Sequence, residues 1–179
     1  MTIKQFVKSK TFKCILVLLC IALVSGALLS ICNDLLAVSD EERVLRTIKS
    51  IYGTEVGYTE LDVNYKNDVG EIISVYQLED GNYLIKSKGK DGYQQGTITV
   101  WLVAEFENEA FSKVGAVTIA EYEKQTLMSK FTSSVLNQFK GEVVEGEDKN
   151  IVVGGATFSA NALNNAVNTA IDYVFEELN

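Results

Sequence analysis

Residues 97–122 read TITVWLVAEFENEAFSKVGAVTIAEY and decide the fold of this chain. β-branched and aromatic residues dominate Thr97–Phe106 and Val114–Tyr122, a composition that is typical of β-strands. Glu107–Ala110 lies between the two runs and is expected to connect them. A connection this short joins neighbouring antiparallel strands, so the stretch predicts part of a largely antiparallel sheet.

Further strand signals lie on either side of this stretch. Ile72–Leu78 and Tyr83–Ile85 flank Asp80-Gly81, and an Asp-Gly pair suits a tight primed hairpin turn. Two short strand candidates follow later in the chain, at Glu142–Val144 and Ile151–Val153.

After residue 122 the apolar spacing changes to that of helices. Gln125–Phe139 places apolar residues four apart, which predicts one helix. Ser159–Leu178 has an apolar face and predicts a second helix at the end of the chain. The asparagines of this last helix, Asn161, Asn164 and Asn165, are expected to face solvent or to cap the turn. Strands and helices in mixed order predict an α+β fold with a mainly antiparallel sheet and flanking helices.

The N-terminal segment Cys14–Ile31 is almost wholly apolar, and positions 14–33 carry no charge. A run of this length can cross a bilayer as a helix. Four lysines and no acid precede it, which predicts a cytoplasmic N-terminus and an exported remainder. The lysines are Lys4, Lys8, Lys10 and Lys13.

Two alternatives to a membrane anchor remain. A cleaved signal peptide would have the small residues Ser25, Gly26 and Ala27 near its cleavage point. A lipoprotein would use Cys32, but Ile31 stands where a small residue is expected.

These signals divide the chain into four parts: a basic cytoplasmic N-terminus at 1–13, a transmembrane anchor at 14–33, a linking helix at 34–53 and one exported domain at 54–179. Within the third part, Ser39–Tyr52 predicts the helix itself. Ser39 can cap it, and Glu42 can complete a capping box.

Charge and missing residue types exclude several classes of function. The chain has a net charge of −8 and its first 32 residues contribute +4, so residues 33–179 carry −12, which argues against nucleic acid as a partner. There is no histidine, so His-based triads and His-ligated metals are impossible.

The three cysteines, at positions 14, 20 and 32, lie in the apolar segment or at its edge. The exported part therefore has no disulfide, thiolate nucleophile or iron–sulfur ligand set. Any redox chemistry there requires an organic cofactor. A hydrolytic enzyme has little support, because no nucleophile–base pair is visible.

The segment Val152–Ser159, VVGGATFS, combines an apolar run, a glycine pair and the start of a helical pattern. Glycines allow a sharp turn with open N–H groups, and a helix start adds further N–H groups and a positive dipole end. This combination can hold a phosphate, with the hydroxyl of Thr157 beside it. The simpler interpretation is a glycine turn with Thr157 or Ser159 as the helix N-cap.

An N-terminal membrane helix, an exported α+β domain and a late Gly-Ala-Thr before a helix resemble one family. It is the FMN-binding domain family of the Rnf complex G subunit and of the C subunit of sodium-translocating NADH:quinone reductase. Gly155-Ala156-Thr157 and Ser159 match its motif Ser-Gly-Ala-Thr-x-Thr/Ser, and Gly154 stands at the serine. Gly92-Tyr93 and Gly96-Thr97-Ile98 are similar to its Gly-Tyr-x-Gly-x-Ile segment, and Gln125-Thr126 falls at its Glu-Thr-Pro-Gly.

The resemblance implies that FMN is joined through a phosphoester to the side chain of Thr157 by a separate flavin transferase. The implied cofactor-binding residues are Gly154, Gly155, Ala156, Thr157, Ser159 and Thr126. Thr126 could equally serve as a helix N-cap. Trp101 and Tyr93 could stack on the flavin, although aromatic residues in strands more often pack in the core.

The function expected from this resemblance is electron relay through FMN, covalent or noncovalent, without independent catalysis. The chain would be a single-pass cell-membrane protein with its C-terminal domain outside, in contact with other membrane redox subunits. The alternative is a non-redox surface module for binding or structure that has lost flavin.

Overall fold

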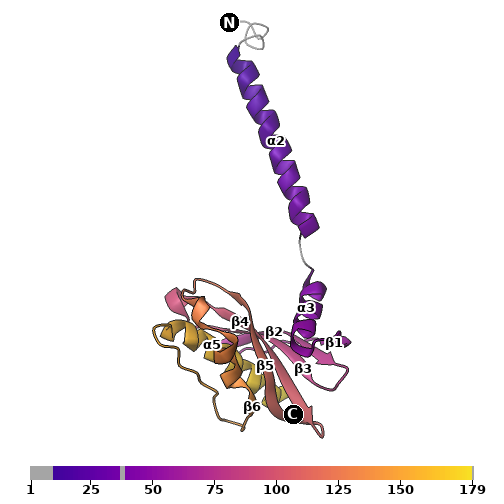
Figure 1. Cartoon of the computed structure of the whole chain (residues 1–179), viewed down its shortest axis with the longest axis vertical. Helices are drawn as coiled ribbons and strands as arrows, with labels where there is room; N and C mark the ends of the chain where they lie inside the picture. The colour runs from indigo at the N-terminus through magenta and orange to yellow at the C-terminus, as the bar shows by residue number, and fades with distance from the viewer. Residues whose placement is uncertain (1–9, 37–38, 179) are drawn as a thin grey trace. The chain divides into compact units, whose positions relative to one another are not determined.

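The computed structural model describes residues 10–36 and 39–178 (Figure 1). The described residues divide into two compact units, one within 1–44 and the other within 45–179. The first contains helix α2 (Lys10–Leu36). Within it, Phe12–Cys32 is long and apolar enough to cross a membrane, and its side chains are mostly exposed. A signal sequence near the N-terminus would have the same properties. Lys4 and Lys8 of the expected basic N-terminus lie outside the described residues.

The second unit is built on a six-stranded sheet in which neighbours in sequence are neighbours in space. Every pairing is antiparallel, as the sequence predicts. The strands are β1 (Tyr58–Leu61), β2 (Gly70–Leu78), β3 (Tyr83–Gly89), β4 (Ile98–Glu107), β5 (Ala110–Tyr122) and β6 (Gly141–Glu142).

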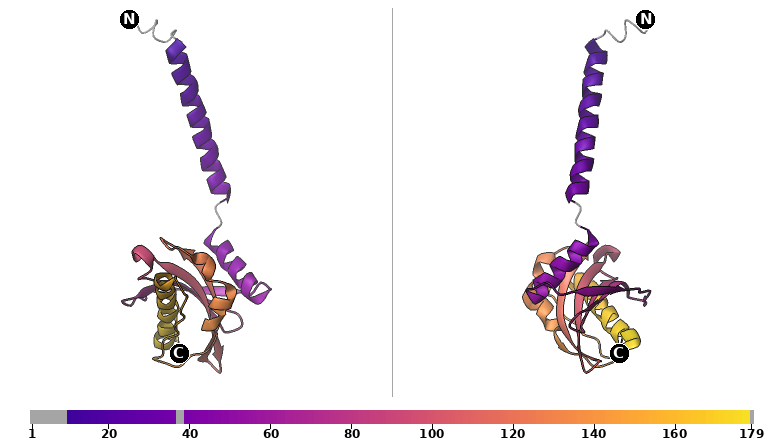
Figure 2. Two further views of the ribbon diagram at one scale, coloured as in Figure 1. Left: turned by 60° about the vertical axis from the view of Figure 1, so that its left-hand side comes forward. Right: turned by 90° about the vertical axis from the view of Figure 1, so that its right-hand side faces the viewer.

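Helices cover both faces of the sheet (Figure 2). Helix α5 (Thr157–Tyr173) packs against β2, β3 and β4, and a π-helical turn, Val174–Leu178, continues it. On the opposite face lies α3 (Asp40–Tyr52), whose Ile48 is fully buried and whose Tyr52 hydroxyl accepts a hydrogen bond from Asn82 Nδ2 at 3.4 Å. The backbone N–H of Glu42 donates to Ser39 Oγ at 3.2 Å, so the predicted cap is present. The α+β class is confirmed.

Small residues let α5 approach the sheet closely. A Cβ at Gly89 of β3 would collide with the backbone of Ala162 and Ala166. The hydroxyl of Ser87 donates to the carbonyl of Ala166 at 2.6 Å. Ala162, Leu163 and Ala166 are fully buried. Side chains larger than these would hold the helix away from the strand.

The hairpin turn at Asp80-Gly81 differs from the one that the sequence predicts, whereas the turn between β4 and β5 lies within the predicted connection Glu107–Ala110. At Asp80-Gly81 the loop has three residues, 79–81, because Leu78 N–H donates to Asn82 O at 2.8 Å and only Gly81 has positive φ. The expected two-residue primed turn is wrong here. It occurs instead between β4 and β5, where Asn108 and Glu109 have φ of +55° and +66°. The pairing register, and not the turn sequence, decides the loop length.

The helix predicted for Gln125–Phe139 is also wrong. Leu127 has φ of +60°, a left-handed conformation that interrupts a helix. Three short elements replace the single helix: η2 (Met128–Lys130), α4 (Ser133–Leu136) and η3 (Asn137–Phe139). Phe131 and Phe139 are buried, so the apolar spacing reports core contacts and not one helical face.

Asparagines of α5 hold two loops to the helix. Asn164 accepts from Ile151 N–H at 3.0 Å and donates to Ile151 O at 3.1 Å, and Asn168 accepts from Lys149 N–H at 2.9 Å. Asn165 donates to Lys90 O at 3.0 Å. Residues 151–153 form no strand: Asn164 pairs both backbone groups of Ile151, and Val153 O accepts from the N–H of Ala156 in the glycine turn. The expectation of solvent-facing or turn-capping roles is wrong for Asn164 and Asn165.

We predict that Asn164→Ala lowers the free energy of unfolding by about 1–3 kcal/mol, because it leaves two buried backbone groups of Ile151 unpaired. The exposed Asn161, three residues earlier on the same helix, is the control. Asn161→Ala should change stability by less than about 0.5 kcal/mol. Urea unfolding of the full chain in detergent, followed by Trp101 fluorescence, measures both. Equal effects of the two changes would contradict this role.

Acidic side chains gather near the end of α5. Burial raises the pKa of the Asp172 carboxyl, with Asp148 and Glu176 adding repulsion. A hydrogen bond from Asn67 Nδ2 at 3.3 Å opposes this change. Because the folded-state pKa exceeds the unfolded value, Asp172 destabilises the fold at neutral pH. That effect disappears as the pH falls through the folded-state pKa to below the unfolded value.

We predict that Asp172→Asn stabilises the domain at pH 7, since the amide removes the charge and its oxygen can still accept from Asn67. The gain should vanish near about pH 2.5, well below the unfolded-state pKa of about 3.9, where the wild-type carboxyl is protonated in both states. Asp62→Asn, at an exposed position, makes the same charge change as a control. Thermal melting at both pH values distinguishes them, and equal melting temperatures of the two variants at pH 7 would refute the argument.

Candidate functional site

The glycine turn leads directly into α5. The N–H of Ala156 donates to Val153 O at 2.9 Å, and Gly155 adopts φ of +75°. Ala156 precedes the helix without a side-chain cap, and Thr157 is the first helical residue. The helix thus starts two residues earlier than predicted, and the interpretation of Thr157 or Ser159 as its N-cap is wrong.

Thr157 is exposed at this helix start. In the part of the chain that the structure describes, its hydroxyl has no hydrogen-bond partner. The first N–H groups of any α-helix lack acceptors in the preceding turn, and the dipole makes this end positive. The arrangement presents a free hydroxyl beside backbone donors that suit an anion.

Lys130 contributes a positive charge to the same turn. Its Nζ donates to the carbonyl of Gly154, from the short η2 element. A Cβ at Gly155 would lie 2.9 Å from this nitrogen, so the absence of a side chain there makes room for the lysine. A Cβ at Gly154 would meet nothing within 4 Å. The two glycines therefore have different roles.

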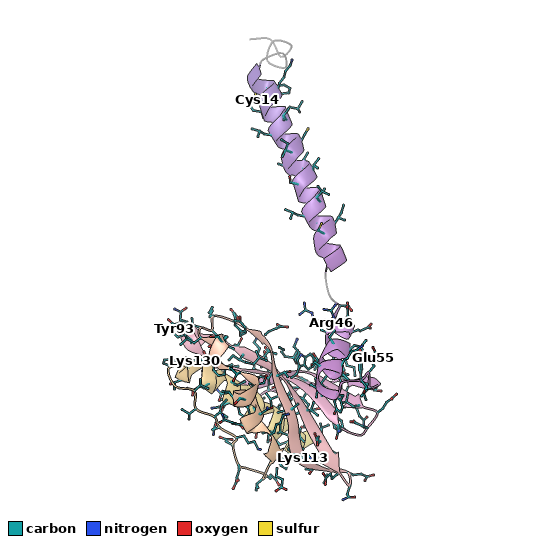
Figure 3. All side chains as sticks on the ribbon, viewed as in Figure 1. Cys14, Arg46, Glu55, Tyr93, Lys113 and Lys130 are labelled. Atoms are coloured by element: carbon teal, nitrogen blue, oxygen red, sulfur yellow. The ribbon has the colours of Figure 1, made fainter. Side chains whose placement is uncertain are left out.

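A groove of about 420 Å³ is lined by Phe158, the residue that follows Thr157. Its walls are residues 91–95, which include the 3₁₀ turn η1 (Tyr93–Gln95), and Phe158 of α5. Tyr93 is 38% exposed and Phe158 61% exposed, large fractions for aromatic side chains. Tyr93 and Lys130 lie at the same end of the domain (Figure 3). The groove offers aromatic surface at the end of the domain that holds Lys130 and the start of α5.

Backbone strain concentrates around this groove. Seven non-glycine residues in the described ranges have positive φ, and five of them lie in residues 91–95 or 124–127. They are Asp91, Gln94, Gln95, Lys124 and Leu127. Such conformations cost energy and persist where surrounding contacts impose them. Both segments border the start of α5.

Ser159 and Thr126 reach the site indirectly. Ser159 is buried, and its hydroxyl donates to Gln125 Oε1 at 2.8 Å and lies 3.4 Å from Thr126 O. Thr126 is exposed, and Leu127, not Thr126, precedes η2, so the N-cap role of Thr126 is wrong. Trp101 is buried against Tyr76 and Lys86, as the core interpretation expects.

Gln125, Lys130 and Phe158 belong to the site but were not singled out as site residues from the sequence. For Phe158 a signal was available, since it directly follows Thr157. Gln125 lies in the segment that falls at the Glu-Thr-Pro-Gly of the resembling family. Nothing local marks Lys130, because its partner Gly154 lies in a distant segment. No group of three or more His, Cys, Asp or Glu residues within the described ranges could hold a metal ion.

No protein-family model, curated protein or solved structure matches this chain. The function must therefore be argued from the residues and geometry of the site.

We predict that Gly155→Ala lowers stability by about 1–2 kcal/mol, because φ of +75° is unfavourable for a residue with a Cβ and the methyl group would press on Lys130. Gly154→Ala, the adjacent control, should be neutral or slightly stabilising. Chemical unfolding of the two variants measures the difference. A Gly154→Ala variant that is the less stable of the two would contradict the geometry.

Proposed function

We propose that this chain is a membrane-anchored, exported flavoprotein that carries FMN at Thr157 and relays electrons within a Rnf-like redox assembly. The observation that supports it best is the exposed, unbonded hydroxyl of Thr157 at the first residue of α5, directly before Phe158, one of two exposed aromatic side chains that line a groove. The resemblance of Gly155-Ala156-Thr157 to the family motif supplies the identity of the cofactor.

The residues present fit a phosphate-bearing aromatic cofactor. The N–H groups at the start of α5 and the ammonium group of Lys130 suit the phosphate. Tyr93 and Phe158 suit a flat ring system, and the groove volume of about 420 Å³ lies in the range of small-molecule sites. FMN, when bound, supplies redox chemistry that no side chain of the exported part provides.

The chain's own residues position the cofactor and shield it. Gly155 keeps the turn open to Lys130, and Thr157 provides the point of attachment. An ester at Thr157 would prevent loss of the cofactor outside the cell. The hydrogen bond from Ser159 to Gln125 supports the start of α5, and it forms without a ligand.

The proposal also assigns α2 as the membrane anchor, with the N-terminus in the cytoplasm. Phe12–Cys32 has the length and composition for this role. An anchored domain would stay near membrane redox subunits that donate and accept electrons. Maturation would require a flavin transferase, and nucleic acid is not a partner of a domain this acidic.

We predict that wild-type protein, purified from cells with an active flavin transferase, is yellow and heavier than the apoprotein by one FMN less one water. Thr157→Ala should lose the adduct completely while melting at the wild-type temperature, because its hydroxyl contacts no described residue. Thr59→Ala, at another exposed threonine, should keep the adduct. Intact-mass spectrometry and the flavin absorbance give the result.

A colourless wild-type chain, made beside a second acceptor that the transferase does modify, would refute covalent attachment. FMN that co-purifies but is released on denaturation would show noncovalent binding. No FMN under either condition would favour the non-redox surface module.

A further inference from the structure

Gln125 is a buried amide at the meeting point of three segments. Its Oε1 accepts a hydrogen bond from the backbone N–H of Tyr93 at 3.1 Å and another from Ser159 Oγ at 2.8 Å. Its Nε2 donates to the carbonyl of Glu123 at 2.9 Å. One side chain thus joins the loop of residues 91–96, the end of β5 and the start of α5.

The loop is shaped around this amide. A Cβ at Gly92 or at Gly96 would collide with Gln125 Nε2. The N–H of Gly92 donates to Gly96 O at 3.0 Å, which closes the loop on itself. Glycine at both positions therefore lets the backbone wrap the buried side chain.

Each wall of the groove has local backbone hydrogen bonds but also one feature that these bonds leave unfavourable. The loop contains Asp91, Gln94 and Gln95 in left-handed conformations, which local preference does not stabilise. The start of α5 has no side-chain cap. A contact from a third segment, that of Gln125, supplies the constraint on both.

We propose that Gln125 is a positioning residue that couples the two walls of the groove and so sets the relation of Tyr93 to Thr157 and Phe158. Loss of the hydrogen bonds that Gln125 accepts from Tyr93 and Ser159 increases the mobility of both walls together. The inference deepens the proposed function, because the coupled residues form its site. Its contacts exist without a ligand and can be tested without one.

The role requires an amide and not a carboxylate. Gln125 accepts two hydrogen bonds with one end and donates with the other, towards Glu123 O. A carboxylate has no donor and would place negative charge against that carbonyl. A protonated carboxyl regains one donor, so the carboxyl of a Gln125→Glu variant can replace the amide only when it is neutral. Burial raises the pKa of such a group, which brings its titration towards pH 5–8.

The experiment is hydrogen exchange with mass spectrometry on the full chain in detergent, without FMN, at pH 5 and pH 8 and corrected for intrinsic rates. For Gln125→Glu we expect exchange at residues 91–96 and at 160–162, the first hydrogen-bonded amides of α5, to rise together by at least tenfold at pH 8 and to return towards wild type at pH 5. Gln138→Glu, at an exposed glutamine, carries the same charge change and should match wild type at both pH values.

Other charged or titratable groups are the same in all these proteins and are controlled by the wild-type and Gln138→Glu measurements. Those on the segments around Gln125 are Lys90, Asp91, Tyr93, Glu121, Tyr122, Glu123, Lys124 and Lys130. If Gln125→Glu does not fold, Ser159→Ala tests the same coupling. Removing that hydroxyl should raise exchange at residues 91–96, across the groove from the substitution.

Exchange that rises in one wall alone, or in neither, would overturn the coupling. So would loosening of Gln125→Glu that is the same at pH 5 and pH 8. FMN binding is scored separately on wild type. Failure to bind FMN with the coupling intact would refute the proposed function and leave the role of Gln125 standing.

Discussion

The close packing of α5 on β3 is the contact on which the rest of this domain depends. Gly89 and Ser87 on the strand, with Ala162 and Ala166 on the helix, bring the two backbones together. At that distance the polar side chains of the helix reach neighbouring loops. Asn164 and Asn168 can then hold residues 149–151 through backbone hydrogen bonds, in place of a further strand. The position of α5 therefore fixes the path of the chain that leads to the glycine turn.

The candidate site lies at the N-terminal end of α5. The packing of α5 on the sheet holds this end of the helix in place. Thr157 and Phe158 lie on the first turn of a helix whose sheet-facing side is buried along its length. The opposite wall is a strained loop, and Gln125 links it to the helix. A rigid helix end, a constrained loop and a lysine at the turn together make a site that can hold an anionic aromatic ligand. Such preorganisation reduces the ordering cost of binding.

The charge at the turn before Thr157 is opposite in sign to the net charge of the domain. Residues 33–179 carry a net charge of −12, which follows from the chain total of −8 and the four N-terminal lysines, yet Lys130 lies at the turn before Thr157. The acidic groups near the end of α5, Asp172 and Glu176, lie at the other end of the same helix. The helix dipole places its positive end at the turn as well. Local charge thus favours an anion at the N-terminal end of α5 although the whole domain repels one.

The sequence by itself determined the α+β class, the antiparallel pairing and the helix that follows Gly-Ala-Thr, because these depend on local composition and short connections. It also indicated Thr157 as a candidate attachment point and Glu107–Ala110 as a connection. Only the tertiary structure decided that 125–139 is broken at Leu127, that the loop at Asp80-Gly81 has three residues, and that Gln125 contacts both the 91–96 loop and the start of α5. The reason is physical. Strand register sets the loop length, and it depends on both strands. The partners of Gln125 include Ser159, 34 positions away, so local periodicity cannot predict this contact.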